Sequence, residues 1–126
     1  METVTMSAVE LKVALRNFTG TEHYHQHRTE DGKSMLLTDG VKYLAEQAQC
    51  YWLLDMVQSY QIRKDIADTL LQVWILKKHG ECDWTLHCTD GNYTVLARQD
   101  IQYSDFPLDE IKLYFSDLVL MLVSEY

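Results

Sequence analysis

The feature that most constrains the fold is the apolar pattern between Gly40 and Tyr60. Apolar side chains recur there every three or four residues, which places them along one side of an α-helix. Thr38 or Asp39 can cap the N-terminus of this helix. The apolar stripe consists of Val41, Leu44, Ala45, Ala48, Trp52 and Met56, and it is widened by Tyr51, Leu53 and Leu54. The pattern therefore predicts one long central helix that packs against other elements on its apolar side.

Three runs in the second half of the chain have the composition of β-strands. They are Leu70 to Lys77, Cys82 to Thr89 and Tyr93 to Gln102. The gaps between them contain Gly80 and Gly91, and short glycine-containing turns join neighbouring antiparallel strands. The pattern predicts an antiparallel meander. Alternation along the last run predicts that its odd positions point inward, namely Tyr93, Val95, Ala97 and Ile101.

Two shorter strands are expected before the central helix, at His23 to Arg28 and at Ser34 to Thr38. The segment that joins them, residues 30–33, contains Asp31-Gly32. Asp-Gly readily supplies the positive φ angles of a hairpin turn. We therefore expect these two strands to form a hairpin.

A helix is also expected near each end of the chain. At the N-terminal end, Ser7 and Glu10 form an S-x-x-E capping box for a helix from Ser7 to Phe18. Near the C-terminus, Asp105 can cap a helix and Pro107 fits its first turn. Asp109 and Glu110 would then complement the helix dipole.

The segment Leu118 to Val123 is ambiguous, because a short apolar run is compatible with two structures. It can continue the C-terminal helix, or it can form a buried strand after a turn at Ser116-Asp117. We favour the strand and leave the helix open.

The chain has 126 residues, which is enough for one domain with its own core. The elements above predict a single α+β domain over residues 1–126. An antiparallel sheet of about four to six short strands would pack against the long central helix. N-terminal and C-terminal helices would flank these two layers.

The cysteines and the N-terminal sequence point to the cytoplasm. The chain begins with acidic and hydroxyl residues, where a secretory signal would have positive charge and an apolar run. Three cysteines leave one unpaired in any disulfide scheme, which suits a reducing compartment. They are Cys50, Cys82 and Cys88. We interpret them as buried structural thiols rather than a reactive pair.

The negative charge is concentrated in the second half of the chain. The formal net charge is −8; residues 1–64 contribute eight acidic and seven basic side chains, and residues 65–126 contribute eleven acidic and four basic ones. Such a field repels nucleic acids and membrane headgroups and attracts basic protein surfaces. We therefore expect neither direct nucleic-acid binding nor membrane binding.

Four strings resemble a known family. They are "FTGTEHY", "LTDGVKYLAE", "YSDFPLDEI" and the terminal "SEY", within a match from about Asn17 to Tyr126. Together they are similar to a small domain family of unknown function found in bacteria, cyanobacteria and mobile elements. The resemblance implies a compact intracellular domain, and it implies no reaction and no catalytic residues.

His23, His25 and His27 place three imidazoles, which are potential metal ligands, within five residues. On a strand their side chains would point the same way, but a zinc site would need further ligands from another segment. We interpret them mainly as the polar face of a strand, and a metal site or a pH-responsive patch remains an alternative. No phosphate-binding loop and no serine-nucleophile elbow is present, and no cofactor is expected.

Acidic and aromatic residues alternate in the C-terminal part of the chain, and such surfaces suit protein recognition. The candidate binding residues are Asp100, Tyr103, Asp105, Phe106, Asp109, Glu110 and Asp117. The sequence thus favours a non-enzymatic module that binds a protein with a basic surface. Its sharpest form is an acidic inhibitor of bacterial nucleic-acid machinery, encoded by a mobile element or phage. The alternative is a small metal-binding or hydrolytic enzyme that uses His23, His25 and His27.

Overall fold

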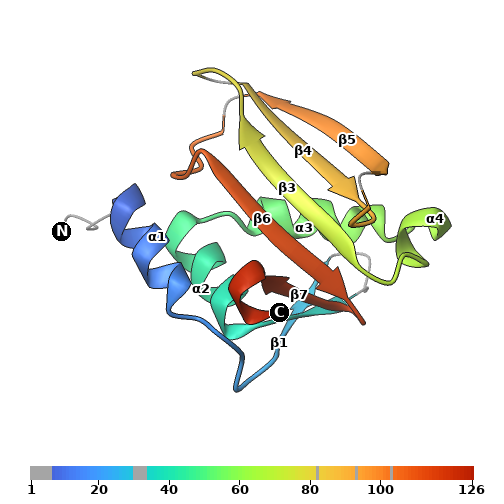
Figure 1. The fold of residues 1–126 in the computed structure, drawn as a ribbon, viewed down its shortest axis with the longest axis horizontal. Coiled ribbons are helices and arrows are strands. Elements are labelled where there is room, and N and C mark those ends of the chain that lie inside the picture. Colours follow the sequence, from blue (N-terminus) through green and yellow to red (C-terminus); the bar gives the residue numbers. More distant parts are fainter. Residues whose placement is uncertain (1–6, 30–33, 82, 93, 103) are drawn as a thin grey trace.

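The described residues form four α-helices, one short 3-10 helix and seven strands (Figure 1). The computed structural model describes residues 7–29, 34–81, 83–92, 94–102 and 104–126. The helices are α1 (Ala8–Arg16), α2 (Asp39–Ala48), α3 (Tyr51–Tyr60), α4 (Lys64–Ala67) and the 3-10 helix η1 (Val123–Glu125). The strands are β1 (His25–Arg28), β2 (Ser34–Leu37), β3 (Gln72–Lys78), β4 (Asp83–Thr89), β5 (Val95–Gln102), β6 (Glu110–Ser116) and β7 (Val119–Leu122).

All seven strands belong to one mixed sheet, in the order β1-β2-β7-β6-β3-β4-β5. Neighbouring strands are antiparallel except for β2 and β7, which are parallel. The backbone amide of Leu36 donates to the carbonyl of Leu118 at 2.8 Å, and the amide of Thr38 donates to the carbonyl of Leu120 at 3.2 Å. This junction joins the β1–β2 hairpin to the other five strands, so the sheet is larger than the four to six strands expected.

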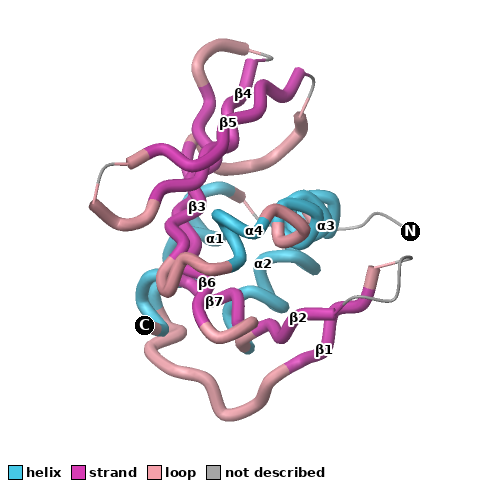
Figure 2. The backbone as a smooth tube through the Cα atoms, turned by 90° about the vertical axis from the view of Figure 1, so that its right-hand side faces the viewer, coloured by secondary structure: helices cyan, strands magenta, loops and turns pink. Residues whose placement is uncertain are grey.

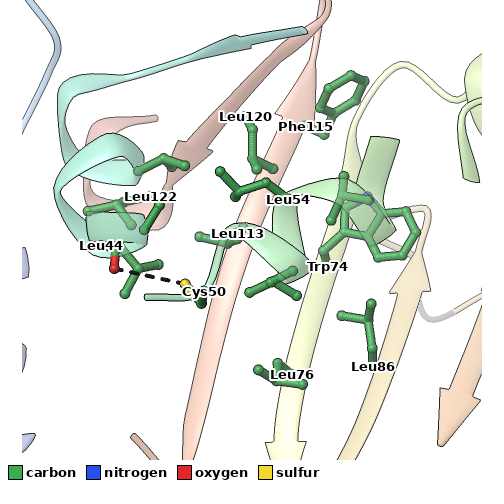
Figure 3. Close-up of a cluster of buried hydrophobic side chains, with 14 of the residues drawn as sticks. Leu44, Cys50, Leu54, Trp74, Leu76, Leu86, Leu113, Phe115, Leu120 and Leu122 are labelled. Carbon is green, nitrogen blue, oxygen red and sulfur yellow. Dashed lines mark hydrogen bonds between the residues drawn. The ribbon is translucent and has the colours of Figure 1, made fainter. Parts of the chain in front are cut away.

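The α-helices lie on the inner side of the curved sheet (Figure 2). The core forms where α2 and α3 meet the central strands, as the close-up in Figure 3 shows. Leu44 of α2 and Leu54 of α3 are fully buried there. Trp74 of β3 and Leu113 of β6 are each 1% exposed and pack in the same cluster. Long-range contacts between helices and strands therefore hold the two layers together.

The expected single long helix is wrong, because the chain breaks between α2 and α3. Gln49 adopts a left-handed conformation with φ of 50°, which ends α2. The apolar pattern changes side at this point. Continuing the spacing of α2 beyond Ala48 leads to Trp52, which is half-buried, and to the exposed Asp55, whereas the buried residues of α3 include Leu53, Leu54 and Val57. The break allows both apolar sides to face the sheet.

The prediction of a C-terminal helix is also wrong, because the residues expected to begin that helix lead into β6. Residues 107–109 are bends, and the strand begins at Glu110. Leu113 and Phe115 are buried, whereas Glu110 and Lys112 are exposed, which is the alternation of a strand. The next segment confirms the favoured interpretation: β7 is a strand, and it follows a turn in which Asp117 and Leu118 have φ of 51° and 65°.

One prediction for the meander also fails in part. The β3–β4–β5 meander is present and antiparallel, but its last strand contains an irregularity. Cys88 is opposite Ala97, and Thr89 is opposite Val95, so one extra residue is inserted between these pairs. The insertion reverses the orientation of Val95, which is 58% exposed, whereas Ala97 is 7% exposed. Tyr93, the first of the expected inward positions, lies outside the described residues.

The N-terminal elements confirm the expected capping and hairpin. The side chain of Ser7 accepts a hydrogen bond from the backbone amide of Glu10 at 3.2 Å and so caps α1. β1 and β2 pair antiparallel, although β1 begins at His25 rather than His23. The expected turn at residues 30–33 lies outside the described residues. Within the described ranges, none of the helices has the length and apolar character needed to span a bilayer.

Candidate functional site

Acidic side chains gather at one end of the sheet, where β3 and β5 finish and β4 and β6 begin (upper left in Figure 1). We call this region the acidic end; it comprises Glu81, Asp83, Asp100, Asp105, Asp109 and Glu110. Each of these residues is exposed. The backbone amide of Lys78 donates to the carbonyl of Asp109 at 2.9 Å, and the amide of His79 donates to the carbonyl of Asp83 at 2.8 Å. These bonds hold the β3–β4 turn against the start of β6.

Two lysines, Lys77 and Lys78, lie at the same end and offset only part of this charge. Lys77 is opposite Glu110 in the β3–β6 register. The Nζ atom of Lys78 lies 5.8 Å from the centre of the Trp84 ring, in a cation–π position. Six carboxylates against these two ammonium groups and the Arg98 guanidinium of β5 leave the acidic end negative.

A hollow of about 320 Å³ opens on the β4–β5 part of the acidic end. Asp83 and Asp100 both contribute to its wall, with His79 and Arg98 beside them. Asp83 is opposite Gln102, and Asp100 lies two residues before Gln102 on the same face of β5. Asp83 and Asp100 are therefore diagonal neighbours, with Cα atoms about 7–8 Å apart. The Arg98 guanidinium Nε is 3.8 Å from Asp100 Oδ1. The hollow can accept a basic side chain beside these carboxylates.

The structure brings together four of the predicted binding residues, namely Asp100, Asp105, Asp109 and Glu110. Asp117 lies at the other end of β6, seven residues from Glu110 and therefore roughly 23 Å away. Phe106 is only 5% exposed and packs edge-on against Trp84, with ring centroids 5.7 Å apart. Phe106 therefore belongs to the core and is not a surface anchor.

Two acidic residues of this region escaped the sequence analysis, and one predicted aromatic residue lies outside the described part of the chain. Glu81 and Asp83 come from the β3–β4 turn and join the site only because β3 pairs with β6. In the sequence, both residues lie close to Gly80 in a charged turn, and this position was the signal that could have identified them. Tyr103 is not among the described residues.

The histidines do not converge on one point. His23 lies outside β1 and is exposed. His25 Nε2 is 2.7 Å from Asp39 Oδ1, and His27 Nε2 is 2.7 Å from Asp55 Oδ1. The described residues include no group of three histidine, cysteine or acidic side chains placed to share a metal ion.

These pairs instead attach the edge strand β1 to the two main helices. Asp39 begins α2, and Asp55 lies within α3. His27 also stacks on Tyr51 of α3, with ring centroids 6.1 Å apart. The hydrogen bond with His25, followed by one from the backbone amide of Glu22, lowers the pKa of Asp39 from 3.8 to about 2. Asp39 is therefore ionised at all ordinary pH values.

The start of α2 is a second junction, where the "FTGTE", "LTDG" and "SEY" segments meet. The hydroxyl of Thr21 accepts a hydrogen bond from the amide of Asp39 at 2.8 Å and donates to the carbonyl of His23 at 2.6 Å. From the other side, Glu125 Oε1 accepts from the Thr38 hydroxyl at 2.6 Å. A carboxylate at a helix N-terminus is stabilised by the free amides and the helix dipole. These segments therefore hold the fold together at α2.

The cysteines in the described residues are structural, as expected. Cys50 and Cys88 are free thiols and are fully buried. Burial raises the pKa of each thiol to about 12, so both remain protonated and weakly nucleophilic. Cys82 lies outside the described residues.

Comparison with known proteins identifies a family. Residues 9–126 match DUF6876, a family of unknown function, and the chain belongs to that family. No curated protein matches the chain, and no solved structure matches its fold.

Proposed function

We propose that this member of the DUF6876 family is a non-enzymatic, protein-binding module whose acidic end contacts a basic surface on another protein. The observation that carries the proposal is the grouping of six exposed carboxylates with only two lysines and Arg98 at one end of the sheet. General solubility requires no such grouping, because dispersed charges serve it equally well.

The geometry supports recognition of lysine or arginine side chains. Unlike charges on facing surfaces raise the association rate and exclude partners of the wrong charge. The hollow beside Asp83 and Asp100 offers space for one basic side chain. Asp105, Asp109 and Glu110 continue the negative surface along the adjoining loop and strand. The same surface repels nucleic acids, so the partner is a protein.

A protein that binds DNA or RNA carries a basic groove complementary to phosphate groups. An acidic surface can occupy such a groove and compete with the nucleic acid. We therefore extend the proposal to an inhibitor of bacterial nucleic-acid machinery that acts in the cytoplasm and is encoded by a mobile element or phage. The supporting observation is again the acidic end, since its charge has the sign of a phosphate backbone.

The direct test is capture of binding proteins from bacterial lysate by the immobilised native chain. The account predicts that proteins with nucleic-acid-binding grooves are retained at low salt. It also predicts that moderate salt weakens retention, because the Debye length falls to about 8 Å at physiological ionic strength. Added duplex DNA should release the captured proteins. Retention that is unchanged by moderate salt and by added DNA would contradict the proposal.

A further inference from the structure

β5 is the outermost strand of the sheet on the β3–β4 side. No other strand of the described residues pairs with its free edge, which forms the upper right margin in Figure 1. The free edge of an eight-residue strand presents backbone amides and carbonyls to any strand that fits it. Edge strands of this length are normally blocked, covered or paired with another chain.

We propose that β5 pairs with β5 of a second copy of this chain, antiparallel and about a twofold axis at Gln99. The two sheets then become one continuous sheet. This interface is isologous, because each strand presents the same residues to the other. The charge pattern of the strand itself identifies the occupant.

Arg98 and Asp100 carry that pattern on the outer face of the sheet. They are opposite His87 and Thr85 of β4 in the register, and their side chains are 66% and 79% exposed. With the axis at Gln99, Arg98 of each copy lies directly opposite Asp100 of the other. Opposite charges at directly opposed positions stabilise a strand pair.

The neighbouring registers are unfavourable. An axis at Arg98 would place the two Arg98 side chains opposite each other, and an axis at Asp100 would do the same with the two Asp100 side chains. Like charges directly opposite are destabilising. A shift of one residue in the relative register would pair inner-face residues of one copy with outer-face residues of the other, so the helix layers would lie on opposite faces and the twofold symmetry would be lost. Among these registers, the axis at Gln99 satisfies layering and also places opposite charges directly across from each other.

The inner face is compatible with the same register. Ala97, which is 7% exposed, would lie opposite the half-buried Ile101 of the second copy, and this places two apolar side chains in contact. Gln99 meets its own counterpart at the axis, beside the Tyr60 hydroxyl that donates to its Oε1 at 2.8 Å. The pairing does not need Leu96, whose carbonyl already accepts from Arg63 at 3.2 Å.

This pairing uses only Asp100 from the acidic end. Asp105, Asp109 and Glu110 lie outside the five paired residues 97–101, so reversing their charges tests the proposed function separately. The self-association test needs only changes at Arg98 and Asp100.

The experiment measures molecular mass by sedimentation over a concentration series at physiological ionic strength. The native chain should reach twice the mass of one chain. Arg98→Asp alone and Asp100→Arg alone should each remain monomeric, because each change places like charges opposite. The double variant with both changes should again dimerise, since the opposed pair is restored in reverse.

A mixture of the two single variants provides a further check. The Arg98→Asp variant has two acidic residues at positions 98 and 100, and the Asp100→Arg variant has two basic ones. The mixture should therefore form a heterodimer, although neither variant self-associates. Hydrogen exchange of those amides in 97–101 that face the free edge should slow in each dimeric sample, because the others already pair with β4. The circular dichroism of all variants should match that of the native chain. A monomeric native chain would overturn the proposal, as would dimeric single variants or a double variant and mixture that stay monomeric.

Discussion

Glu125 Oε2 accepts a hydrogen bond from the backbone amide of Gly40 at 3.1 Å, and these two residues are 85 positions apart in the chain. Glu125 Oε1 also accepts from the amide of Leu122 and from the hydroxyl of Thr38. One carboxylate thus connects the start of α2 to the end of β7. This contact attaches the C-terminal segment to the N-terminus of α2.

Replacing Glu125 by alanine should lower the free energy of unfolding by roughly 1–3 kcal/mol, because donors at the start of α2 and at Leu122 lose their acceptor. Urea denaturation measures the change. Glu110→Ala is the matched control, since it removes the same charge from an exposed position and should change stability by less than about 0.5 kcal/mol. Equal losses in the two variants would show that Glu125 has no capping role.

Gly40→Ala should destabilise the protein, although alanine normally favours a helix. A Cβ atom at position 40 would lie 2.5 Å from Glu125 Oε1 and 2.5 Å from Leu122 Cδ1. Crowding of this kind costs roughly 1–3 kcal/mol. Gly20→Ala is the control, because a Cβ there meets nothing within 4 Å. Thermal unfolding of the two variants should differ clearly, and a Gly40→Ala variant as stable as the native chain would reject the close approach.

Trp84 should contribute more to stability than Trp52. Trp84 is 1% exposed and packs against Phe106, so Trp84→Ala should cost about 3–5 kcal/mol. Trp52 is only half-buried, and Trp52→Ala should cost less. Chemical denaturation of both variants gives the order, and a larger loss for Trp52→Ala would contradict the packing of the meander.

The stability of the protein should fall as the pH decreases from about 4 to about 2, partly through Asp39. Its pKa is lowered to about 2 in the folded chain, from 3.8. A lowered carboxyl pKa contributes stability that is present above the unfolded value and is lost as the pH falls through the folded value. Asp39→Asn should therefore flatten the acid side of the stability profile in that window.

The cause of this pKa can be checked by nuclear magnetic resonance. Titration of the Asp39 carboxyl carbon should give a midpoint near 2 in the native chain. In His25→Ala the midpoint should move toward 3.8, because the hydrogen bond with His25 is the largest cause of the shift. An unchanged midpoint would mean that the other hydrogen bonds of Asp39, and not the one with His25, lower its pKa.

The parts of the fold that depend on local signals were predictable. The Ser7 N-cap specifies the start of α1, and glycine-containing turns specify the β3–β5 meander. The break at Gln49 was missed because no glycine or proline marks it. The remaining signal for a break in the helix was the change in the apolar pattern after Ala48. β6 was missed because Asp105 and Pro107 imitate a helix start, although alternation from Glu110 to Phe115 indicates a strand.

The candidate site depended on pairings that no local pattern contains. Asp100, Asp105, Asp109 and Glu110 come from one continuous part of the chain, so the sequence could group them. Asp83 joins them because β3 pairs with both β4 and β6. The carboxylate partners of His25 and His27 come from helices 14 and 28 positions further along the chain. Such contacts follow from the packing of the layers and not from spacing.

The central claim, that the acidic end binds a basic protein surface, is tested most directly by comparing two variants with equal net charge. The first variant replaces three residues of the acidic end, Asp105, Asp109 and Glu110, with lysine. The second replaces three exposed acidic residues elsewhere with lysine, namely Glu22, Glu46 and Asp68. The affinity of each is measured by calorimetry for a protein captured by the native chain. Like charges facing each other cost several kcal/mol, so the first variant should bind at least about a hundredfold more weakly, and the second should bind within a few-fold of the native chain. Equal affinities for the two variants would contradict the account, because binding would then depend on net charge or on another surface.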